Sequence, residues 1–515
     1  MGDVVVYGGT AGGVCAAVAA ARAGAQVTLV EPGRHLGGMV SGGLGYTDLG
    51  DARVLGGLGR EFMLAIAERY DVPPGHFAGP EPHVAEAILT GWVEDAKVDV
   101  VFGATLTGAQ VVDGVITAIS TTAGDYTAGV YVDASYEGDL MAAAGVPYDI
   151  GRESRTKYGE SLAGRREFAP GKHQFPPFVS PLTTPPAPYG KSPEHEPAAV
   201  LPLVHARPLA EVGAGDGGVM AYGYRVCLTQ AADRIPFERR AGYDPAEWEL
   251  ARRWFAVLRT GGVEVSAGDV IGLVPNLPNA KCDGNSIGPL SLSLLDGTNW
   301  AYPDADPTER ERIRRRHEDY TRDFLWFMTT DPDVPRSVRD GLAAWGLPVD
   351  EFTDTGGLPH QLYVREARRM RGEYVLTQHD LLPRPAAQYD SVAMGSYHID
   401  VRELQRTWSV AYEHPDPVAS VFNEGYLSVG VAPYQIPYRC IVPRYDDCRN
   451  LLVPVCLSAS HVAFASVRME VQYEMLGQAA GLAAAQAVAT ARAVQQIDVR
   501  RLQDDLHAAG AVLAL

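Results

Sequence analysis

Cysteine is scarce in this 515-residue sequence, and its six cysteines form no C-x-x-C pair. That scarcity removes the usual ligand pattern of an iron–sulfur cluster or a zinc site, so we expect no metal. The C-x-x-x-x-C pair of disulfide reductases is also missing. Scattered cysteines suit a reducing compartment, and we expect a cytoplasmic protein.

Positive charge is scarce as well, with 44 Lys and Arg against 63 Asp and Glu and a net charge of −19. This sign is wrong for nonspecific binding to nucleic acid or to an anionic membrane surface. Charged residues such as Arg468 and Glu474 interrupt the least polar long stretch, residues 451–494. We therefore expect no membrane insertion. A strand that starts at Asp3 leaves no room for a cleaved signal before it.

The strongest pattern lies at the N-terminus. A strand of β-branched residues, 4–6, runs into a glycine turn that opens a helix of small residues. Free amides at such a helix start, together with the helix dipole, bind the pyrophosphate of a dinucleotide. Gly8 permits the tight turn, and Gly13 permits close packing of helix and strand. We predict that the turn binds the cofactor through Gly8, Gly9, Thr10, Gly12 and Gly13.

Thr10 replaces the middle glycine of the usual G-x-G-x-x-G pattern, and Gly9 and Gly12 are expected to allow the close approach to phosphate instead. A second apolar strand, 26–30, ends on Glu31, where an acid bonds the ribose hydroxyls and repels a 2′-phosphate. A second glycine turn follows, with the predicted cofactor-binding residues Gly37, Gly38, Met39, Ser41, Gly42 and Gly43. These details together favour FAD over NAD as the cofactor.

Helical spacing predicts helices over 56–70, 82–95 and 307–330. An Asp-Gly turn at 113–114 joins two strands of a meander, and the strand 130–134 follows it. Asp133 at the end of that strand is predicted either to cap the next helix or to face the cofactor, with Gly138 beside it. Near the C-terminus, a helix is expected to open at Leu476 and to direct its N-terminus at the flavin through Gly477, Gln478 and Ala479. The alternative is that these small residues only pack closely against another helix.

These motifs resemble a family of bacterial FAD-dependent oxidoreductases with a flavin fold of the glutathione-reductase type. The resemblance rests on the segments 8–13, 35–39, 43–45, 133–139, 158–161, 363–370, 395–400, 434–439, 458–461, 466–470 and 476–481. It implies an α/β class, α+β overall, with a Rossmann-like FAD-binding domain that is split in sequence. We expect its first part at 1–160 and its C-terminal part at 425–515. A mixed α/β substrate domain at 161–424 would be inserted between them, with an ordered proline-rich connection at 165–205.

One segment departs from the family pattern. Asn279–Asn285 contains fewer Asn residues than the family segment, and Ser291-Leu292-Ser293 stands where the family has Ser-Thr-Asp. If this segment lines the substrate pocket, the substrate of this protein differs from that of other family members. No second glycine fingerprint predicts an NAD(P)H-binding domain. The electron acceptor is therefore expected to be oxygen, a quinone or a protein.

Dehydrogenation by a flavin needs a base for the proton that accompanies the hydride, and His suits this role. His461 is the first candidate because it lies between the last strand and the flavin-facing helix, and His398 is the second. Each could also have a purely structural role. Substrate-binding candidates are Arg439, Tyr434, Arg468 and Tyr397, with Lys281 and Asn285 weaker. Both arginines could clamp a substrate carboxylate or pair with an acid of the protein.

Three functions fit this pattern. The first is a dehydrogenase or oxidase that transfers a hydride from a small polar molecule to flavin N5, at a CH–OH, CH–NH or CH–CH bond. The second is an isomerase or lyase that uses FAD without net oxidation. The third is a non-enzymatic FAD-binding subunit that carries electrons.

Overall fold

The structure is a computed structural model that describes residues 3–45, 47–73, 79–169, 173–184, 200–411 and 417–515. The chain divides into two compact units. Unit 1 contains Met1–Ala163, Val364–Asp400 and Ser428–Leu515, and unit 2 contains Gly164–Tyr363 and Val401–Leu427. Unit 1 thus includes residues 364–400, which the sequence places in the inserted domain. Parts of the predicted connection at 165–205, namely 170–172 and 185–199, lie outside the described residues.

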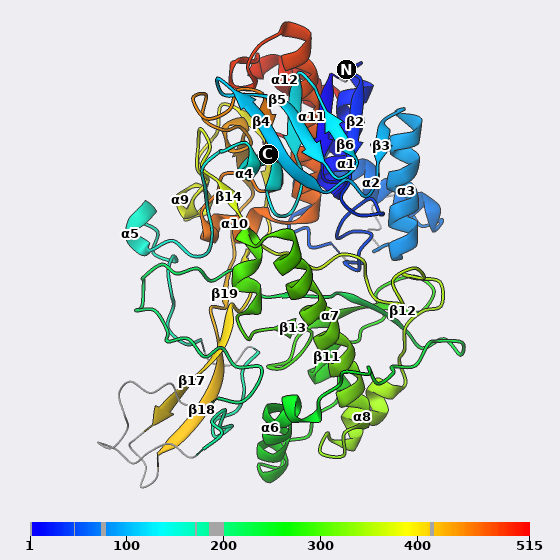
Figure 1. Cartoon of the computed structure of the whole chain (residues 1–515), viewed down its shortest axis with the longest axis vertical. Coiled ribbons are helices and arrows are strands. Elements are labelled where there is room, and N and C mark those ends of the chain that lie inside the picture. Colours follow the sequence, from blue (N-terminus) through cyan, green and yellow to red (C-terminus); the bar gives the residue numbers. More distant parts are fainter. Residues whose placement is uncertain (1–2, 46, 74–78, 170–172, 185–199, 412–416) are drawn as a thin grey trace. The chain divides into compact units, whose positions relative to one another are not determined.

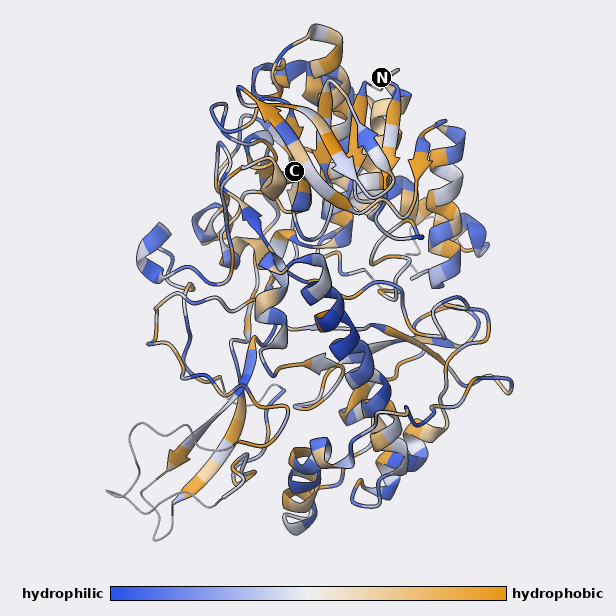
Figure 2. Cartoon of the chain, viewed as in Figure 1, coloured by the Kyte–Doolittle hydropathy of each residue, from blue (hydrophilic) through white to orange (hydrophobic). Residues whose placement is uncertain are grey.

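Unit 1 is built on a parallel sheet with the strand order β21-β7-β1-β2-β3. Its strands β2 and β3 are labelled in Figure 1. The strands are β1 (Val4–Tyr7), β2 (Val27–Val30), β3 (Asp99–Val101), β7 (Val130–Asp133) and β21 (Leu451–Leu452). In the register, Val4 pairs with both Val27 and Val130. The apolar composition of these strands, orange in Figure 2, is typical of parallel strands covered on both faces. The predicted α/β class with a Rossmann-like sheet is confirmed, and the glutathione-reductase subtype stays a prediction.

Helices cover this sheet. The α-helices of unit 1 are α1 (Ala11–Arg22), α2 (Gly57–Arg69), α3 (Pro82–Asp95), α4 (Asp139–Ala143), α5 (Arg155–Tyr158), α9 (Gln378–Leu381), α10 (His461–Val467), α11 (Glu470–Thr490) and α12 (Val499–Ala508). Both α2 and α3 lie where the sequence predicts them. All residues of α1 from Ala11 to Ala20 are buried, so this helix lies in the core of the unit.

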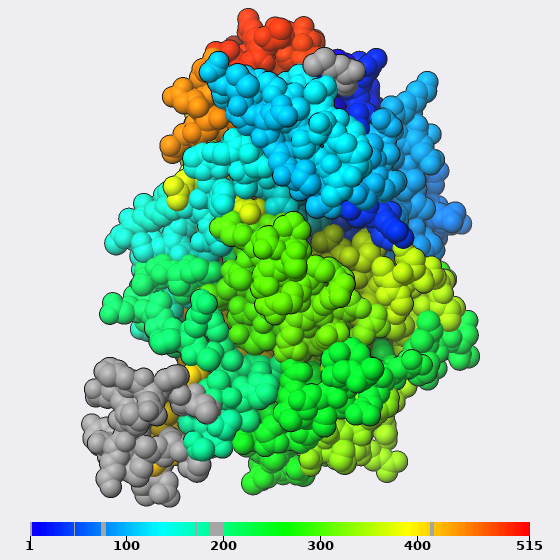
Figure 3. Space-filling model, viewed as in Figure 1, coloured from blue at the N-terminus to red at the C-terminus, as the bar shows by residue number. Residues whose placement is uncertain are grey.

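An antiparallel meander follows β3. Its strands are β4 (Leu106–Val112), β5 (Val115–Thr121) and β6 (Gly124–Tyr126). Asp113 and Gly114 both have positive φ, as a two-residue hairpin turn requires. Figure 3 shows this meander at the surface of unit 1, where Val112 is 58% exposed. The other short strands of the unit are β8 (Tyr148–Asp149), β14 (Arg369–Met370), β15 (Ser391–Gly395) and β20 (Tyr434–Pro437).

In the part that the structure describes, unit 2 combines small antiparallel sheets with three α-helices. Its strands are β9 (Tyr222–Gly223), β10 (Val226–Thr229), β11 (Ile271–Gly272), β12 (Lys281–Ser286), β13 (Ser293–Leu294), β17 (Gln405–Ala411) and β18 (Val418–Glu424). Its helices are α6 (Glu249–Thr260), α7 (Pro307–Thr330) and α8 (Arg336–Ala343). The helix α7 has the bounds that its charged, amphipathic pattern predicts. β16 (Ile399–Val401) and β19 (Leu427–Val429) contain two of the points where the chain passes between the units.

Short 3-10 helices connect these elements: η1 (Ala52–Val54), η2 (Pro245–Trp248), η3 (Ala267–Asp269), η4 (Thr298–Asp304), η5 (Tyr438–Cys440) and η6 (Val494–Gln496). Among the described residues, no helix has both the length and the apolar character that a membrane span requires.

Candidate functional site

The turn between β1 and α1 brings the predicted pyrophosphate-binding glycines together. Gly8 has a φ of +97°, and an added Cβ there would lie 2.7 Å from the amide nitrogen of Ser135. A Cβ on Gly13 would lie 1.9 Å from the carbonyl oxygen of Gly8. The amide of Gly12, in the first turn of α1, has no acceptor within the part of the chain that the structure describes. Such an amide at a helix start can donate to a phosphate oxygen.

Thr10, the residue that replaces the middle glycine, is the N-cap of α1. Its Oγ1 accepts a hydrogen bond from the amide of Gly13 at 3.1 Å and donates to the carbonyl of Ala134 at 2.8 Å. The side chain therefore caps the helix and also ties it to the end of β7. A glycine at this position could make neither bond.

Glu31 lies directly after β2, beside the first glycine turn. Its carboxylate accepts hydrogen bonds from the amide of Gly9 at 2.6 Å and from the amide of Gly33 at 2.5 Å. Burial raises the pKa of Glu31 to about 7, and the two amide hydrogen bonds partly oppose this shift. The carboxylate thus lies beside the first glycine turn, and its binding of a ribose stays a prediction.

The second glycine turn is held by the first turn and by Tyr136. The amide of Gly37 donates to the carbonyl of Gly9 at 2.7 Å. The hydroxyl of Tyr136 accepts from the amide of Met39 at 2.9 Å and donates to Oε1 of Glu470 at 2.9 Å. A Cβ on Gly38 would lie 2.5 Å from this hydroxyl. The other predicted residues close the turn: Ser41 Oγ donates to the carbonyl of Leu36, the amide of Gly42 donates to the carbonyl of Met39, and Gly43 has a φ of +110°.

The carboxylate of Asp133 accepts hydrogen bonds from the segment that follows β7. Its Oδ1 accepts from the amide and the hydroxyl of Ser135, and its Oδ2 accepts from the amide of Met141 at 2.7 Å. Burial raises the pKa of this carboxyl to about 6, although the hydrogen bonds lower it. Gly138 precedes α4 with a φ of +69°. These contacts correspond to the helix-capping alternative for Asp133.

Helix α11 begins at Glu470, so the prediction that a helix opens at Leu476 is wrong. Gly477 lies inside the helix, where an added Cβ would be 2.0 Å from the carbonyl oxygen of Gly12. A Cβ on Gly481 would be 2.2 Å from the carbonyl oxygen of Ala16. These glycines allow α11 to touch α1, as the close-packing alternative states.

The two residues that follow Gly477 also make contacts within unit 1. Oε1 of Gln478 accepts a hydrogen bond from the amide of Leu58, at the start of α2, at 2.9 Å. Ala479 is completely buried. The N-terminal end of α11, which the sequence expects to face the flavin, therefore carries Glu470 and not Gly477.

Three polar side chains in the first turns of α11 are buried: Glu470, Gln472 and Glu474. Oε2 of Glu470 and all side-chain oxygen and nitrogen atoms of Gln472 and Glu474 have no hydrogen-bond partner among the described residues. Burial raises the pKa of Glu470 to about 8 and the pKa of Glu474 well above its usual value. Burial therefore favours the protonated form of both carboxyls.

His461, the first predicted base, is the first residue of α10 and is 3% exposed. Its Nδ1 lies 2.8 and 2.9 Å from the two carboxylate oxygens of Glu366. A carboxylate at Nδ1 selects the tautomer that carries its proton there, which leaves the lone pair on Nε2. Among the described residues, Nε2 has no hydrogen-bond partner.

A buried ion cluster fixes this pair. Arg369 donates to the carboxylates of both Glu366 and Glu153, and its Nη2 lies 2.6 Å from Oε1 of Glu153. Oε2 of Glu153 accepts from the backbone amide of His461 at 2.9 Å. Ser460 precedes the histidine and donates to Glu160 at 2.6 Å. The imidazole is thus held through its ring and through its backbone, an arrangement suited to a base of fixed orientation.

The C-terminal end of α10 gathers two of the predicted substrate-binding residues. The hydroxyls of Tyr434 and Ser466 lie 2.8 Å apart, and Ser466 donates to the carbonyl of Tyr397 at 2.5 Å. Burial raises the pKa of the Tyr397 hydroxyl, and the charges of Asp48 and Asp400 add to this shift. Tyr434 is buried among these neighbours, whereas the side chain of Tyr397 is partly accessible.

Arg468 and His398 share the carboxylate of Asp400. Nη2 of Arg468 lies 3.2 Å from Oδ2 of Asp400 and 2.9 Å from its carbonyl oxygen. Nε2 of His398 is 3.8 Å from Oδ1 of Asp400, too far for a hydrogen bond. The side chain of His398 is 34% exposed, so the structure holds this candidate base less firmly than His461.

Arg439 pairs with an acid of the same unit. Its Nε lies 2.9 Å from Oδ2 of Asp390, and its guanidinium is 4.7 Å from the ring centre of Tyr374 and 4.8 Å from that of Tyr389. This arrangement satisfies the guanidinium without a substrate carboxylate.

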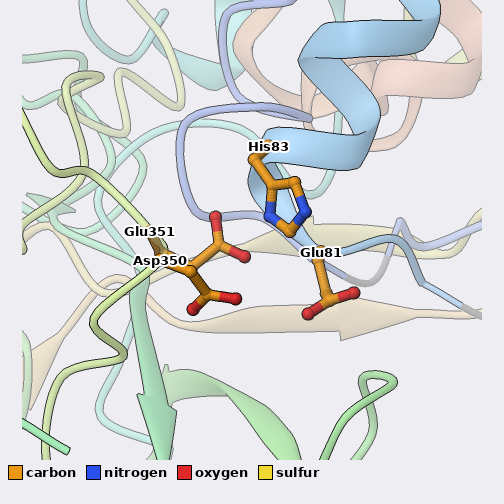
Figure 4. Close-up of side chains that lie close together, drawn as sticks. All are labelled: Glu81, His83, Asp350 and Glu351. Carbon is orange, nitrogen blue, oxygen red and sulfur yellow. The ribbon is translucent and has the colours of Figure 1, made fainter.

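The weaker candidates lie on β12 of unit 2. Nζ of Lys281 lies 2.8 Å from Oδ2 of Asp350 and 2.8 Å from Oε1 of Glu351, whose neighbouring carboxylates are drawn in Figure 4. Asn285 pairs with Gly272 in the sheet. Lys281 therefore belongs to a local ion cluster.

Four acids of the site were not predicted: Asp48, Glu153, Glu366 and Glu470. A signal existed for two of them, because Glu366 and Glu470 lie within motifs that carry the family resemblance. For Asp48, a lone acid directly after a glycine-rich turn, the sequence offers only that position.

The model of the family described as FAD dependent oxidoreductase matches residues 3–506. The chain therefore belongs to this family of oxidoreductases, and FAD is its cofactor. No curated protein matches the sequence.

Two solved structures show partial similarity. L-proline dehydrogenase from P. horikoshii is 16% identical, with a TM-score of 0.24, and the match covers 30% of this chain and 58% of that one. L-amino acid deaminase from Proteus vulgaris is 15% identical, with a TM-score of 0.24, and the match covers 30% of this chain and 53% of that one. The chain thus spans less than two thirds of either structure.

The residues of unit 1 fit FAD. The amide of Gly12 offers a donor to the pyrophosphate, Glu31 offers a carboxylate to the ribose, and the turn from Gly37 to Gly43 follows directly. An added Cβ would clash with Ser135 at Gly8 and with Tyr136 at Gly38, so the close packing of both turns requires glycine.

Proposed function

We propose that the protein is a flavin dehydrogenase or oxidase of a small polar substrate, with His461 as the base. The observation that carries the proposal is the buried pairing of His461 with Glu366, since a carboxylate at Nδ1 prepares Nε2 to accept a proton. Bound FAD supplies the hydride acceptor.

The residues around the imidazole orient the base and stabilise its charged form. Glu366 fixes the ring and stabilises the imidazolium that forms when Nε2 takes the substrate proton. Arg369 and Glu153 hold Glu366 and the start of α10 in place. Burial of the cluster excludes water, which strengthens each of these charge interactions.

An anaerobic screen tests the proposal. The FAD-loaded protein is mixed with polyols, hydroxy acids, amines and saturated acids while the visible absorbance of the flavin is recorded. Lasting bleaching by one class supports a dehydrogenase or oxidase, and admission of oxygen, a quinone or a protein acceptor then identifies the oxidant. Turnover without bleaching would instead indicate an isomerase or lyase, and no turnover with any class would indicate an electron-carrying subunit.

A further inference from the structure

The first turn of α11 lies against both glycine turns of unit 1. A Cβ on Gly12, in the first glycine turn, would lie 2.9 Å from the carbonyl oxygen of Tyr473. A Cβ on Gly38, in the second glycine turn, would lie 2.5 Å from the hydroxyl of Tyr136, which donates to Glu470 at 2.9 Å. The sequence predicts that both turns bind FAD. The start of α11 therefore lies beside the backbone that is predicted to hold the cofactor.

Glu470, the first residue of α11, has one oxygen in use and one without a partner. The residue is 4% exposed, and its Oε1 accepts the hydrogen bond from Tyr136. Among the described residues, Oε2 has no hydrogen-bond partner. A buried polar atom without a partner is costly, so a hydrogen bond from Oε2 to a ligand at this place would be favourable.

The hydrogen bonds determine which oxygen of Glu470 carries the proton of the neutral carboxyl. The hydroxyl of Tyr136 accepts a hydrogen bond from the amide of Met39, so its own hydrogen is directed to Oε1 of Glu470. Burial raises the pKa of Glu470 to about 8 and the pKa of Tyr136 well above its usual value. In the neutral form the proton is therefore on Oε2, the oxygen that has no partner.

We propose that Oε2 of Glu470 donates a hydrogen bond to bound FAD and couples the reduction of the flavin to the uptake of a proton. A donor next to the flavin favours the reduced state, which is more negative than the oxidised state. Reduction by dithionite or by a substrate gives the flavin two electrons and one proton. Where Glu470 has lost its proton, Oε2 takes up a second proton from solvent, because the carboxylate repels the charge of the reduced flavin. The proposal holds for a dehydrogenase and for an electron carrier, so it does not rest on the proposed function.

The charged and titratable groups around this proton are Tyr136, Arg468, Tyr473 and Glu474. The hydrogen bond from Tyr136 and the charge of Arg468 favour the carboxylate of Glu470 and oppose the effect of burial. Tyr473 acts on Tyr136 through its charge. Burial and the charge of Glu470 raise the pKa of Glu474 well above its usual value, so Glu474 should lose its proton at a higher pH than Glu470.

The midpoint potential of the FAD-loaded protein, titrated with dithionite from about pH 7 to about pH 9.5, tests the proposal. In wild type the potential should fall by one proton per two electrons below about pH 8 and approach two protons per two electrons above it. Glu470→Gln keeps a donor but cannot titrate, so it should follow the shallower slope throughout. The control Glu68→Gln, at an exposed acid of α2, should keep the steeper slope.

Two further variants separate hydrogen bonding from a structural role. Glu470→Leu removes the donor, so at about pH 7 its preference for reduced over oxidised FAD should be at least tenfold weaker than in Glu470→Gln, or about 30 mV. Tyr136→Phe removes a bond that favours the carboxylate, so the change of slope should move to higher pH. A single slope in wild type, or equal steepening in wild type and Glu470→Gln, overturns the proposal. The wild-type titration needs neither a substrate nor a variant, so its result is independent of the proposed function and of how the variants fold.

Discussion

The ring of His461 is bonded through Nδ1 to the carboxylate of Glu366, at 2.8 Å, although 95 residues separate the two in the chain. The histidine begins a helix of unit 1, and the glutamate lies in the segment 364–400 that returns to the same unit. A histidine that only oriented a loop would not need a buried acid that is itself held by an arginine. This relationship distinguishes His461 from the other histidine that the sequence suggested.

The first prediction concerns the identity of the base. His461→Gln should lower kcat by about 100-fold or more, the usual contribution of a general base, with the FAD content unchanged. His398→Gln, the matched substitution at the competing candidate, should change kcat by less than about threefold. The effect of each substitution is measured by stopped-flow reduction of the flavin with the substrate found in the anaerobic screen. A larger loss in His398→Gln would move the role of base to that residue.

The second prediction concerns the buried ion cluster. Arg369→Met would leave the carboxylates of Glu153 and Glu366 buried without their common cation, so it should destabilise the protein by about 3–5 kcal/mol. Urea unfolding followed by circular dichroism measures the loss. The control is Arg53→Met, because Arg53 pairs with Asp51 at the exposed surface, so its loss should leave the unfolding transition unchanged. Equal effects of the two substitutions would show that the cluster is dispensable.

The third prediction concerns the contact between α1 and α11. In Gly477→Ala the new methyl group would lie 2.0 Å from the carbonyl oxygen of Gly12, so the helices must separate. We expect a loss of about 1–3 kcal/mol or more together with a lower FAD content, because α1 carries the phosphate-binding turn. Gly91→Ala in α3 is the matched control, since no atom lies within 4 Å of its added Cβ. Helix propensity should make this control neutral or more stable by up to about 1 kcal/mol.

The fourth prediction concerns pH. Burial raises the pKa of Glu470 to about 8, while its hydrogen bond from Tyr136 and the charge of Arg468 oppose the shift. Above the ordinary carboxyl pKa the unfolded chain loses this proton and the folded chain keeps it, so stability falls as pH rises until about 8. Glu470→Gln removes this effect. The free energy of unfolding of the variant minus that of wild type should therefore rise by roughly 3–5 kcal/mol between pH 5 and 8.5.

Unfolding of wild type and variant at both pH values, with equal flavin content, measures this difference. Glu68→Gln, at an exposed acid of α2, should show no such pH-dependent gain. A constant difference between wild type and Glu470→Gln at the two pH values would contradict the prediction.

Local patterns account for what the sequence predicted correctly. The spacing of apolar residues identified α2, α3 and α7, and the run from Gly8 to Gly13 identified the start of α1. The start of α11 was missed because Met469 supplies no capping side chain, whereas the small residues after Leu476 imitate a helix start. Composition cannot distinguish a glycine at a helix end from one at a helix crossing.

The partners of the candidate base were missed for a different reason. Glu366 and His461 meet only because residues 364–400 fold back into unit 1, a long-range event that no local spacing encodes. The same holds for the hydroxyls of Tyr434 and Ser466, which lie 2.8 Å apart although 32 residues separate them in the chain.

The contact between Gly12 and Gly477 also has a consequence for biosynthesis. Helix α1, whose residues from Ala11 to Ala20 are buried, is translated before its neighbour α11, which begins at Glu470. Until α11 has been translated, we expect the face of α1 that it covers to stay exposed, and exposed apolar surface promotes aggregation. We therefore expect stable FAD binding only after α11 has been translated and has packed against α1.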